Sequence, residues 1–273
     1  MADTGSSVAI IIVTYNSREE IDACLDSLVG HTKPFHATIT VVDNASRDGT
    51  VAFVREKFPS VQVNEAGDNL GFSKANNLGI RATKSDYVVI LNPDTVTPPG
   101  GMQALVRGLA SNLDAAIAGA RLLSDRGFPE LSWGPPISPW SEFKQMVLGG
   151  LYRQKIRRIV RKIDKLSRQP RKVAWVSGAC MAIRRPDLEA VGLFDERYFM
   201  YREDVDLCLA MHKRGRDILY MAPAEVLHLR GKSAAKNPQV ETRRGQSHLA
   251  YYQKHLPMWA PVLKIYLTLR GRL

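Results

Sequence analysis

Residues 85–94 read Ser-Asp-Tyr-Val-Val-Ile-Leu-Asn-Pro-Asp, an apolar run that ends on a polar tripeptide. The apolar residues 87–91 fit a strand that is buried on both faces of a mostly parallel sheet. Pro93 cannot donate a hydrogen bond to a central ladder, so we expect the strand to end near Asn92. Asp94 then lies beyond the carboxyl end of the strand, where open α/β sheets bind ligands. A carboxylate there suits Mg²⁺ or Mn²⁺, while a turn built from Asp and Pro is the simpler alternative.

The composition is that of an ordinary globular protein. A chain of 273 residues can form one large domain with an appendage, and 45% of the residues are hydrophobic. No run approaches the 18 or so apolar residues of a membrane span, and the first residues lack the basic region of a secretory signal. The three cysteines show no metal-ligand spacing, so we expect them to be reduced core residues of a cytoplasmic protein.

Nearly all of the net charge of +11 lies in one segment. Residues 143–172 contain eleven Lys or Arg and one acid, Asp164, which gives the segment a charge of +10. Apolar residues recur there every three or four positions and predict an amphipathic helix over about 142–167, within a basic insertion over about 142–170. Such a helix suits an anionic membrane surface, and packing of its apolar stripe on the main domain is the plainer alternative.

An acidic partner or nucleic acid is the third interpretation of the basic segment. No nucleic-acid-binding motif and no aromatic stacking platform accompanies the cations. We therefore expect no nucleic acid partner.

The first hundred residues alternate between two kinds of segment. Apolar runs predict strands over 8–13, 39–42, 61–64 and 87–91. Helices are predicted between them, over about 17–29, 49–57 and 73–82, and the first would begin with a capping box formed by Ser17 and Glu20. Strands that alternate with helices indicate βαβ units and a doubly wound parallel sheet.

Polar residues follow three of these strands. Thr14, Tyr15 and Asn16 follow the first, Asp43 follows the second, and Asp94 follows the fourth. Because the carboxyl ends of parallel strands meet at one edge, a nucleotide could lie across these side chains. The chain has no Gly-x-Gly-x-x-Gly or Walker-type loop, which argues against a dinucleotide dehydrogenase or an NTPase.

The second half of the chain adds a further set of polar residues. Residues 173–183 predict one or two strands broken at Gly178, and an aromatic run then ends in Glu203, Asp204 and Asp206 before a helix. Acids at a helix start commonly cap it, whereas a catalytic role needs one of them to face a substrate hydroxyl. His228 stands at an apolar strand end, where it is a structural residue unless it converges on Asp94.

The ordered motifs resemble those of the family 2 inverting glycosyltransferases, which have the GT-A fold. In this sequence they read Val-Thr-Tyr-Asn (13–16), Val-Asp-Asn-Ala-Ser-Arg-Asp-Gly-Thr (42–50), Asn-Leu-Gly-Phe-Ser-Lys-Ala-Asn-Asn (69–77), Leu-Asn-Pro-Asp (91–94), Phe-Asp-Glu (194–196) through Glu-Asp-Val-Asp-Leu (203–207), and His-x-x-Gly-x-Ser (228–233). The resemblance covers about residues 8–235 without the basic helix. It is nearest to the bacterial rhamnosyltransferases and galactofuranosyltransferases.

The resemblance implies a role for each matched position. Asp43 would bind the pyrimidine base, and the other donor-binding residues would be Thr14, Tyr15, Asn16, Asn69, Gly71, Phe72 and Asn76. Asp94 and His228 would hold Mg²⁺ or Mn²⁺. Asn92 replaces the first acid of the family's metal motif, and its neutral amide would bind ribose or the donor sugar instead.

The catalytic pair implied by the resemblance is Glu203 and Asp204, with Asp204 as the general base. Trp175 and Gly178 are our candidates for acceptor binding. An inverting transfer needs one carboxylate to deprotonate the acceptor hydroxyl while the nucleoside diphosphate leaves from the opposite face. A metal ion would neutralise the charge that grows on this leaving group.

We therefore expect an α/β glycosyltransferase that moves L-rhamnose from dTDP-rhamnose to a glycan or lipid-linked acceptor in cell-surface polysaccharide synthesis. A UDP-sugar transferase for galactofuranose or a hexose, and a non-catalytic protein that binds sugar nucleotides or anionic lipids, are the alternatives. The expected domains are 1–235, divided into a nucleotide-binding half (1–100) and an acceptor half (101–235), and a helical tail (236–273). The basic helix and this tail would hold the protein on the inner face of the cell membrane, and the sequence leaves the oligomeric state open.

Overall fold

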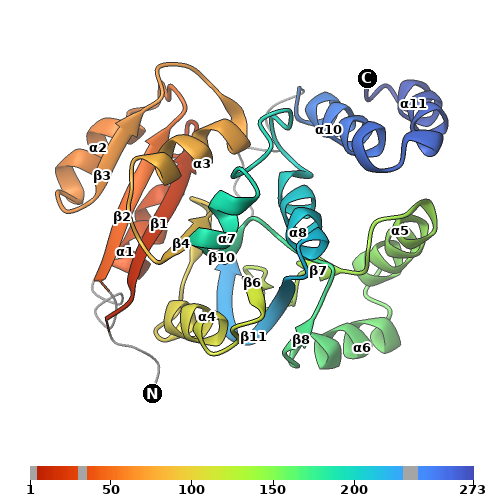
Figure 1. Cartoon of the computed structure of the whole chain (residues 1–273), viewed down its shortest axis with the longest axis horizontal. Coiled ribbons are helices and arrows are strands. Elements are labelled where there is room, and N and C mark those ends of the chain that lie inside the picture. Colours follow the sequence, from red (N-terminus) through yellow and green to blue (C-terminus); the bar gives the residue numbers. More distant parts are fainter. Residues whose placement is uncertain (1–4, 30–35, 230–238) are drawn as a thin grey trace.

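The computed structural model describes residues 5–29, 36–229 and 239–273 (Figure 1). Its centre is a mixed sheet with the strand order β3 (Gln62–Glu65), β2 (His36–Asp43), β1 (Ser7–Thr14), β4 (Tyr87–Leu91), β10 (Cys180–Arg184), β6 (Ala115–Leu123), β11 (Asp217–His228) and β5 (Thr95–Val96). The short strand β8 (Arg171–Lys172) pairs with β11. Helices lie on both faces of this sheet (Figure 1). The architecture confirms the predicted α/β fold with a mostly parallel sheet flanked by helices.

The first half of the chain forms neighbouring parallel strands. They are β1 (Ser7–Thr14), β2 (His36–Asp43), β3 (Gln62–Glu65) and β4 (Tyr87–Leu91). The strand β4 has the predicted bounds, and all five of its residues are buried between β1 and β10. Thr14 pairs with Asp43 at the carboxyl ends of β1 and β2, so the predicted polar clusters do share one edge of the sheet.

Alternate residues of the central strands face two separate cores, as strand geometry requires. Ile10 of β1 packs in the core covered by α1 (Ile21–Leu28), α2 (Thr50–Lys57) and α4 (Gly101–Ala110). Ile11 faces the opposite core, which is covered by α3 (Gly71–Arg81), α7 (Arg185–Ala190) and α8 (Glu203–Lys213). The sheet is therefore the middle of three layers, and α8 carries the three acids predicted near a helix start.

The predicted capping box at the first helix does not form. The helix α1 begins at Ile21, and no side chain caps it. Ser17 is buried, its hydroxyl accepts a hydrogen bond from the amide of Tyr15, and its carbonyl accepts one from the amide of Ile21 at 2.9 Å. The backbone of Ser17 thus starts the helix, while its side chain closes the turn after β1.

The second half of the chain completes the sheet with strands of both directions. They are β5 (Thr95–Val96), β6 (Ala115–Leu123), β8 (Arg171–Lys172), β10 (Cys180–Arg184) and β11 (Asp217–His228). The strand β10 is antiparallel to both β4 and β6, and β6 is parallel to β11. The predicted break at Gly178 separates β10 from β9 (Trp175–Val176), which pairs with β7 (Trp133–Gly134) in a small second sheet.

The basic segment forms two helices, so the prediction of one continuous helix over 142–167 is wrong. The helices are α5 (Pro139–Arg153), which begins with a capping box formed by Ser138 and Ser141, and α6 (Arg157–Ser167). Between them Lys155 adopts a left-handed backbone with φ of 56°. Apolar residues keep their three- and four-residue spacing across this break, and no Gly or Pro marks it, so the pattern could not reveal it.

The C-terminal region is helical and packs on the second half of the domain. It contains α10 (Gln239–His255), the 3₁₀ turn Pro257–Trp259 and α11 (Ala260–Leu269). Tyr251 and Tyr252 of α10 are buried with Tyr198 and Val205 in a third core. Within the described ranges, none of the helices has the length and apolarity that crossing a bilayer requires.

Candidate active site

The edge formed by the ends of β1 and β2 is a closed hydrogen-bonded unit around Asp43. The Thr14 hydroxyl donates to Asp43 Oδ1 at 2.8 Å, and the Ser46 amide donates to Asp43 Oδ2 at 2.8 Å. Asn16 has a left-handed backbone with φ of 52° and is held by bonds to Ser46 and Arg47. Asp43 is buried, whereas Tyr15 and Asn16 are exposed and free to meet a ligand.

Residues 69–72, which lead into α3, bring the predicted donor residues to the segment that precedes α8. The Asn69 side chain accepts a bond from the amide of Gly71, and the amide of Phe72 donates to the carbonyl of Phe199 at 2.6 Å. Gly71 has φ of 79°, and a Cβ atom there would lie 2.4 Å from the Phe199 carbonyl oxygen. Only glycine allows this approach. Asn76 is buried and binds the carbonyl of Phe72.

Asp94 and His228 meet because β5 pairs with the end of β11. Thr95 lies opposite His228 in this pair, and His228 Nε2 is 3.4 Å from Asp94 Oδ1. His228 Nδ1 lies 2.9 Å from Glu130 Oε2. The rest of the motif that begins at His228, residues 230–233, lies outside the described residues.

Glu130 is a site residue that sequence reasoning missed. It lies in an irregular segment after β6, far from His228 in the chain, and belongs to no motif. Burial alone would lower the pKa of His228, but the bonds to Asp94 and Glu130 outweigh it and raise this pKa to about 9. In the neutral form of the ring, an Nδ1–H bond to Glu130 leaves the Nε2 lone pair beside Asp94.

The Asp94 and His228 pair fits a divalent cation with two protein ligands. In the described part of the chain, no three His, Cys, Asp or Glu side chains form a ready-made metal site. A histidine that binds a metal through one nitrogen is commonly oriented by a carboxylate on the other, which is the position of Glu130. Magnesium and manganese sites near substrate phosphates often use only one or two protein carboxylates, so water and phosphate oxygens would supply the remaining positions.

Asp204 lies at the first turn of α8 and faces Gly178. The amide of Gly178 donates to Asp204 Oδ2 at 3.0 Å, and the amide of Val205 donates to Oδ1 at 2.8 Å. A Cβ atom on Gly178 would lie 3.5 Å from both Asp204 Cβ and Phe72 Cε1. Burial raises the pKa of Asp204, and the backbone hydrogen bonds partly oppose it. The candidate base, one acceptor candidate and one donor candidate therefore meet at one point.

Glu203, the other member of the predicted pair, has a different environment. It is buried, and its Oε2 atom has no hydrogen-bond partner among the described residues. Burial, followed by the neighbouring charge of Asp204, raises the pKa of Glu203 well above its ordinary value. This environment favours the protonated form of Glu203.

The third acid, Asp206, anchors the C-terminal region to α8. Its carboxylate accepts bonds from Tyr198, from Lys254 at 2.8 Å and from His255 at 2.6 Å. Because Lys254 and His255 end α10, this buried cluster fixes that helix beside the first turn of α8, which carries Glu203 and Asp204.

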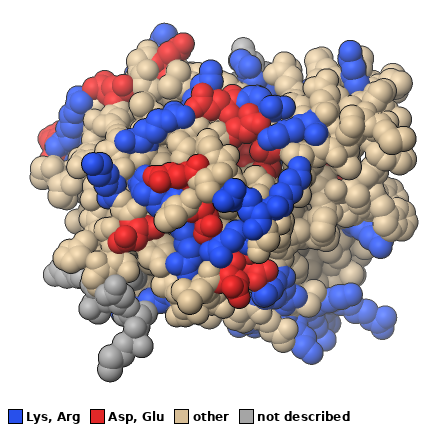
Figure 2. All heavy atoms as spheres, viewed as in Figure 1, with Lys and Arg blue, Asp and Glu red and all other residues tan. Residues whose placement is uncertain are grey.

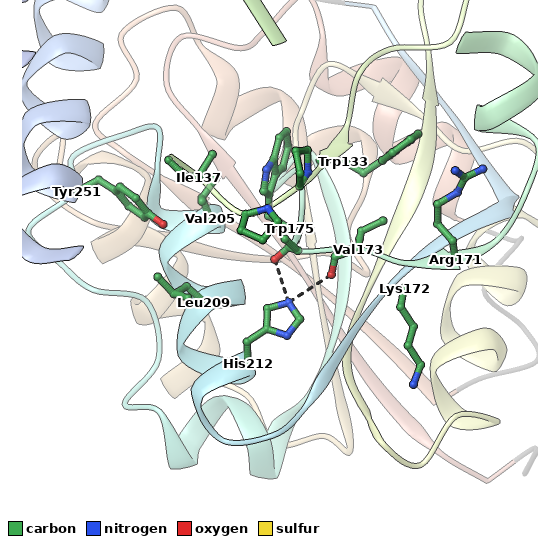
Figure 3. Close-up of a pocket in the computed structure, with 14 residues that line it drawn as sticks. Trp133, Ile137, Arg171, Lys172, Val173, Trp175, Val205, Leu209, His212 and Tyr251 are labelled. Atoms are coloured by element: carbon green, nitrogen blue, oxygen red, sulfur yellow. Dashed lines mark hydrogen bonds between the residues drawn. The ribbon is translucent and has the colours of Figure 1, made fainter. Parts of the chain in front are cut away.

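Two pockets lie on either side of Trp175. The larger has a volume of about 900 Å³, and Asp204 lines it together with residues of α5, α10 and α11. The smaller has a volume of about 640 Å³ and contains His212, which is bonded to the carbonyls of Val173 and Ala174 (Figure 3). Trp175 lines both pockets, and only the larger one opens onto the candidate base.

The arrangement places the candidate base Asp204 beside Gly178 and Phe72 and in the lining of the larger pocket. Two consecutive residues fix the position of Asp204 relative to the turn after β4. The amide of Gly178 donates to Asp204, and the carbonyl of Ala179 accepts a 2.9 Å hydrogen bond from the amide of Asn92. Such a site can deprotonate an alcohol next to a bound, metal-associated phosphate ester.

This chain is similar to known proteins in sequence and in fold. A family model described as glycosyl transferase family 2 matches residues 9–192. The N-acetylglucosaminyl-diphospho-decaprenol L-rhamnosyltransferase of Mycobacterium tuberculosis is 31% identical over 97% of this chain and 89% of its own length. Rhamnosyltransferase WbbL of Escherichia coli strain K12 is 26% identical over 81% of this chain and 83% of its own length.

A solved structure shows the same fold. A mannosyltransferase from Pyrobaculum calidifontis, in complex with GDP-Man and Mn²⁺, has a TM-score of 0.62 and 20% identity, with 94% of this chain and 68% of the other covered. The family match covers the ends of β1, β2 and β4, and the match to the mycobacterial enzyme extends over the first turn of α8 as well. The chain therefore belongs to glycosyltransferase family 2 and is an inverting glycosyltransferase of the GT-A type.

Proposed function

We propose that this enzyme transfers L-rhamnose from dTDP-L-rhamnose to a sugar hydroxyl on a lipid-diphosphate-linked acceptor, in the synthesis of a cell-surface polysaccharide. The observation that carries the proposal is the similarity to the mycobacterial rhamnosyltransferase, which extends over 97% of this chain. That extent includes nearly all of the helices that line the pocket beside Asp204. The likeness thus reaches the acceptor side of the protein as well as the donor edge.

Asp204 is the base in this proposal. It takes the proton of the acceptor hydroxyl, the hydroxyl oxygen forms a bond to the anomeric carbon, and the bond from that carbon to the diphosphate breaks. The nucleoside diphosphate leaves from the opposite face, so the anomeric configuration inverts. A pKa raised by burial makes Asp204 a better proton acceptor near neutral pH than an exposed carboxylate is.

The metal ligands in this proposal are Asp94 and His228, and the ion is Mg²⁺ or Mn²⁺. When bound, the ion supplies positive charge that stabilises the leaving diphosphate. Glu130 fixes the ring of His228, and the neutral Asn92 contributes no charge. Because Asp94 is the one carboxylate among the proposed ligands, the donor diphosphate would supply the further negative charge that holds the ion.

The donor lies, on this proposal, across the exposed side chains that follow β1 and along residues 69–72. The side chains of Tyr15 and Asn16 are exposed to the donor. The carboxylate of Asp43 is hydrogen-bonded to Thr14 and Ser46, so Asp43 reaches the pyrimidine base of the donor only as part of this hydrogen-bonded group. On the acceptor side, the buried indole N–H of Trp175 donates no hydrogen bond to any described residue. A sugar hydroxyl beside Asp204 can accept a hydrogen bond from this N–H.

We also propose that the basic segment, which forms α5 and α6, and the C-terminal helix α11 rest on an anionic membrane surface at the inner face of the cell membrane. Large apolar side chains are exposed on α5, on α11 and on the turn between α10 and α11, among them Trp140, Met146, Met258 and Leu269. Figure 2 shows a largely uncharged surface on the right of the view, where Figure 1 places α5 and α11, with Lys and Arg at its borders. Apolar contact flanked by cations is the pattern of peripheral membrane binding.

The test is a donor panel with a synthetic N-acetylglucosaminyl-diphosphoryl lipid as the acceptor. The panel contains dTDP-L-rhamnose, UDP-galactofuranose and UDP-glucose, and mass spectrometry detects the lengthened acceptor in the presence of Mg²⁺ or Mn²⁺. We expect transfer from dTDP-L-rhamnose alone. Transfer from a UDP-sugar alone would replace the proposed donor, and no transfer from any of the three donors would refute the proposed donor and acceptor pair.

A further inference from the structure

The larger pocket is a groove that runs from the surface to the catalytic base. Its walls come from α5 on one side and from α10 and α11 on the other, and Asp204 and Trp175 lie among its lining residues. Its volume of about 900 Å³ is at the upper end of the range for ligand sites, so it can hold more than one sugar.

The outer walls of the groove are apolar and open. Phe143 and Met146 of α5 are 50% and 56% exposed, and Trp259 and Val262 on the opposite wall are 50% and 57% exposed. Large apolar side chains that face each other across an open groove gain roughly 25 cal/mol for each Å² that a ligand covers. The part of a ligand that fits here is a hydrocarbon chain.

Two arginines stand on the wall of the same groove. Arg244 Nη1 lies 2.8 Å from Glu241 Oε1, and Arg272 Nη2 lies 3.0 Å from Glu241 Oε2, so two guanidinium groups share one carboxylate. Gly245 permits this arrangement, because a Cβ atom there would lie 1.9 Å from the Arg272 carbonyl oxygen. The cluster keeps a net positive charge, and about half of the Arg244 side chain is exposed.

The charged cluster is adjacent to the first turn of α8. The guanidinium of Arg244 stacks on the ring of Tyr201 at 4.4 Å, and Tyr201 precedes Asp204 by three residues. Arg202 also lines the groove, but its guanidinium pairs with Glu142 of α5. An anion bound to Arg244 and Arg272 would thus lie between the apolar walls and the base.

We propose that the groove binds the polyprenyl diphosphate of the acceptor. The diphosphate contacts Arg244 and Arg272, the first isoprene units lie between Met146 and Val262, and the attached sugar reaches Asp204. This assignment rests on the proposed function, since it identifies the site of that reaction's acceptor. An anionic phospholipid satisfies the same charge and the same walls, but it carries no sugar to fill the inner end of the groove beside Asp204.

The experiment measures binding of farnesyl diphosphate, a soluble prenyl diphosphate, without any donor. The fluorescence of Trp175 and Trp259, which both line the groove, reports the binding. We expect farnesyl diphosphate to bind more tightly than either farnesol or inorganic diphosphate. The substitution Arg244→Gln weakens farnesyl diphosphate binding by at least about tenfold, since a lost bond to a charged group costs about 1.5–3 kcal/mol. The substitution Val262→Asp weakens this binding by a similar factor, because it places a charge in the apolar wall.

The matched controls are Arg55→Gln and Leu113→Asp. Arg55 is another guanidinium paired with one glutamate, and Leu113 is another exposed apolar side chain; neither lines the groove. Equal binding by the groove variants and the wild type overturns the proposal, as does full competition by phosphatidylglycerol vesicles, which would make this a phospholipid site. If farnesyl diphosphate binds as expected and no rhamnose is transferred, the groove assignment stands and the proposed reaction fails.

Discussion

The backbone amide of Gly178 donates a hydrogen bond of 3.0 Å to the carboxylate of Asp204, and the next residue, Ala179, holds the amide of Asn92. One dipeptide therefore sets the distance between the candidate base and the turn that contains Asp94. Neither contact depends on a side chain of the dipeptide. The spacing of the two halves of the site is fixed by backbone geometry.

Replacement of Asp204→Asn should remove the general base. We expect kcat for sugar transfer to fall by about 100-fold to 10,000-fold, the usual contribution of general base catalysis. The affinity for the nucleotide sugar, measured by calorimetry, should change little, because Asp204 contacts the acceptor side. Unchanged kcat would refute the role of Asp204. An unchanged circular dichroism spectrum would show that the variant is folded.

Replacement of Glu203→Gln should raise the melting temperature near pH 7. The folded-state pKa of Glu203 is raised, so its carboxyl favours the folded state below the unfolded pKa of about 4.5 and that advantage is lost as pH rises. Glutamine keeps the shape without the ionisation, and each kcal/mol gained corresponds to roughly 2–4 °C. Calorimetric scans at pH 5 and pH 8 measure the difference, which should be larger at pH 8. A lower melting temperature for the variant at both pH values would contradict this account.

Replacement of Glu142→Gln should lower the free energy of unfolding. Burial alone would raise the pKa of Glu142, but bonds to His248 and the charge of Arg202 lower it to about 2. A carboxyl group whose pKa is lower in the folded state stabilises the protein at pH values above its unfolded pKa of about 4.5. A shift of this size contributes about 3 kcal/mol to the free energy of unfolding. This contribution is lost as pH falls from about 4.5 toward 2. Urea denaturation should therefore show a larger difference between variant and wild type at pH 7 than at pH 3, and a constant difference would refute the linkage.

Replacement of Glu130→Gln should weaken binding of Mn²⁺ by about 10-fold to 100-fold, the usual effect of losing a carboxylate that orients a ligating histidine. With a pKa of about 9, His228 is protonated at neutral pH in the free protein, and a metal ion must displace that proton. The Mn²⁺ affinity of the wild type should then increase with pH up to about 9. Electron paramagnetic resonance titrations in the presence of nucleoside diphosphate measure both effects. Identical affinities for variant and wild type would remove Glu130 from the site.

Neutralisation of Arg157, Arg158 and Arg161 should weaken binding to anionic vesicles. All three are exposed on α6, and each basic residue near an anionic surface contributes about 1 kcal/mol. We therefore expect a loss of roughly 100-fold in co-sedimentation at low salt, and a smaller loss at high salt. The control variant neutralises Arg55, Lys84 and Arg107, which are exposed on other elements. Equal losses for the two triple variants would show that the basic segment is not a specific membrane contact.

The strands and their polar ends were predictable because their signals are local. An apolar run closed by a proline was enough to give the bounds of β4, and each predicted motif in the described residues lies at a strand or helix end. The fold class and the glycosyltransferase family are confirmed. The motifs also named Asp204, which accepts a hydrogen bond from the backbone amide of Gly178.

Contacts between distant segments were not predictable from these patterns. Glu130 meets His228 because β6 pairs with β11 and the segment after β6 folds back on the end of β6, and no local signal identifies it. The break between α5 and α6 lies in a stripe whose periodicity continues through it. The capping box failed because Ser17 is buried at the turn after β1, where its hydroxyl has another partner.

Glu142 has a consequence for how this enzyme can be divided. Its carboxylate joins Arg202, which precedes α8, to His248 and Tyr252 of α10, while Glu142 itself belongs to α5. Three segments that are far apart in the chain are thus held by one side chain. A chimera that exchanges the acceptor specificity of this enzyme must move α5, the 201–206 turn and the C-terminal helices together, because any one of them transplanted alone leaves a buried charge without its partner.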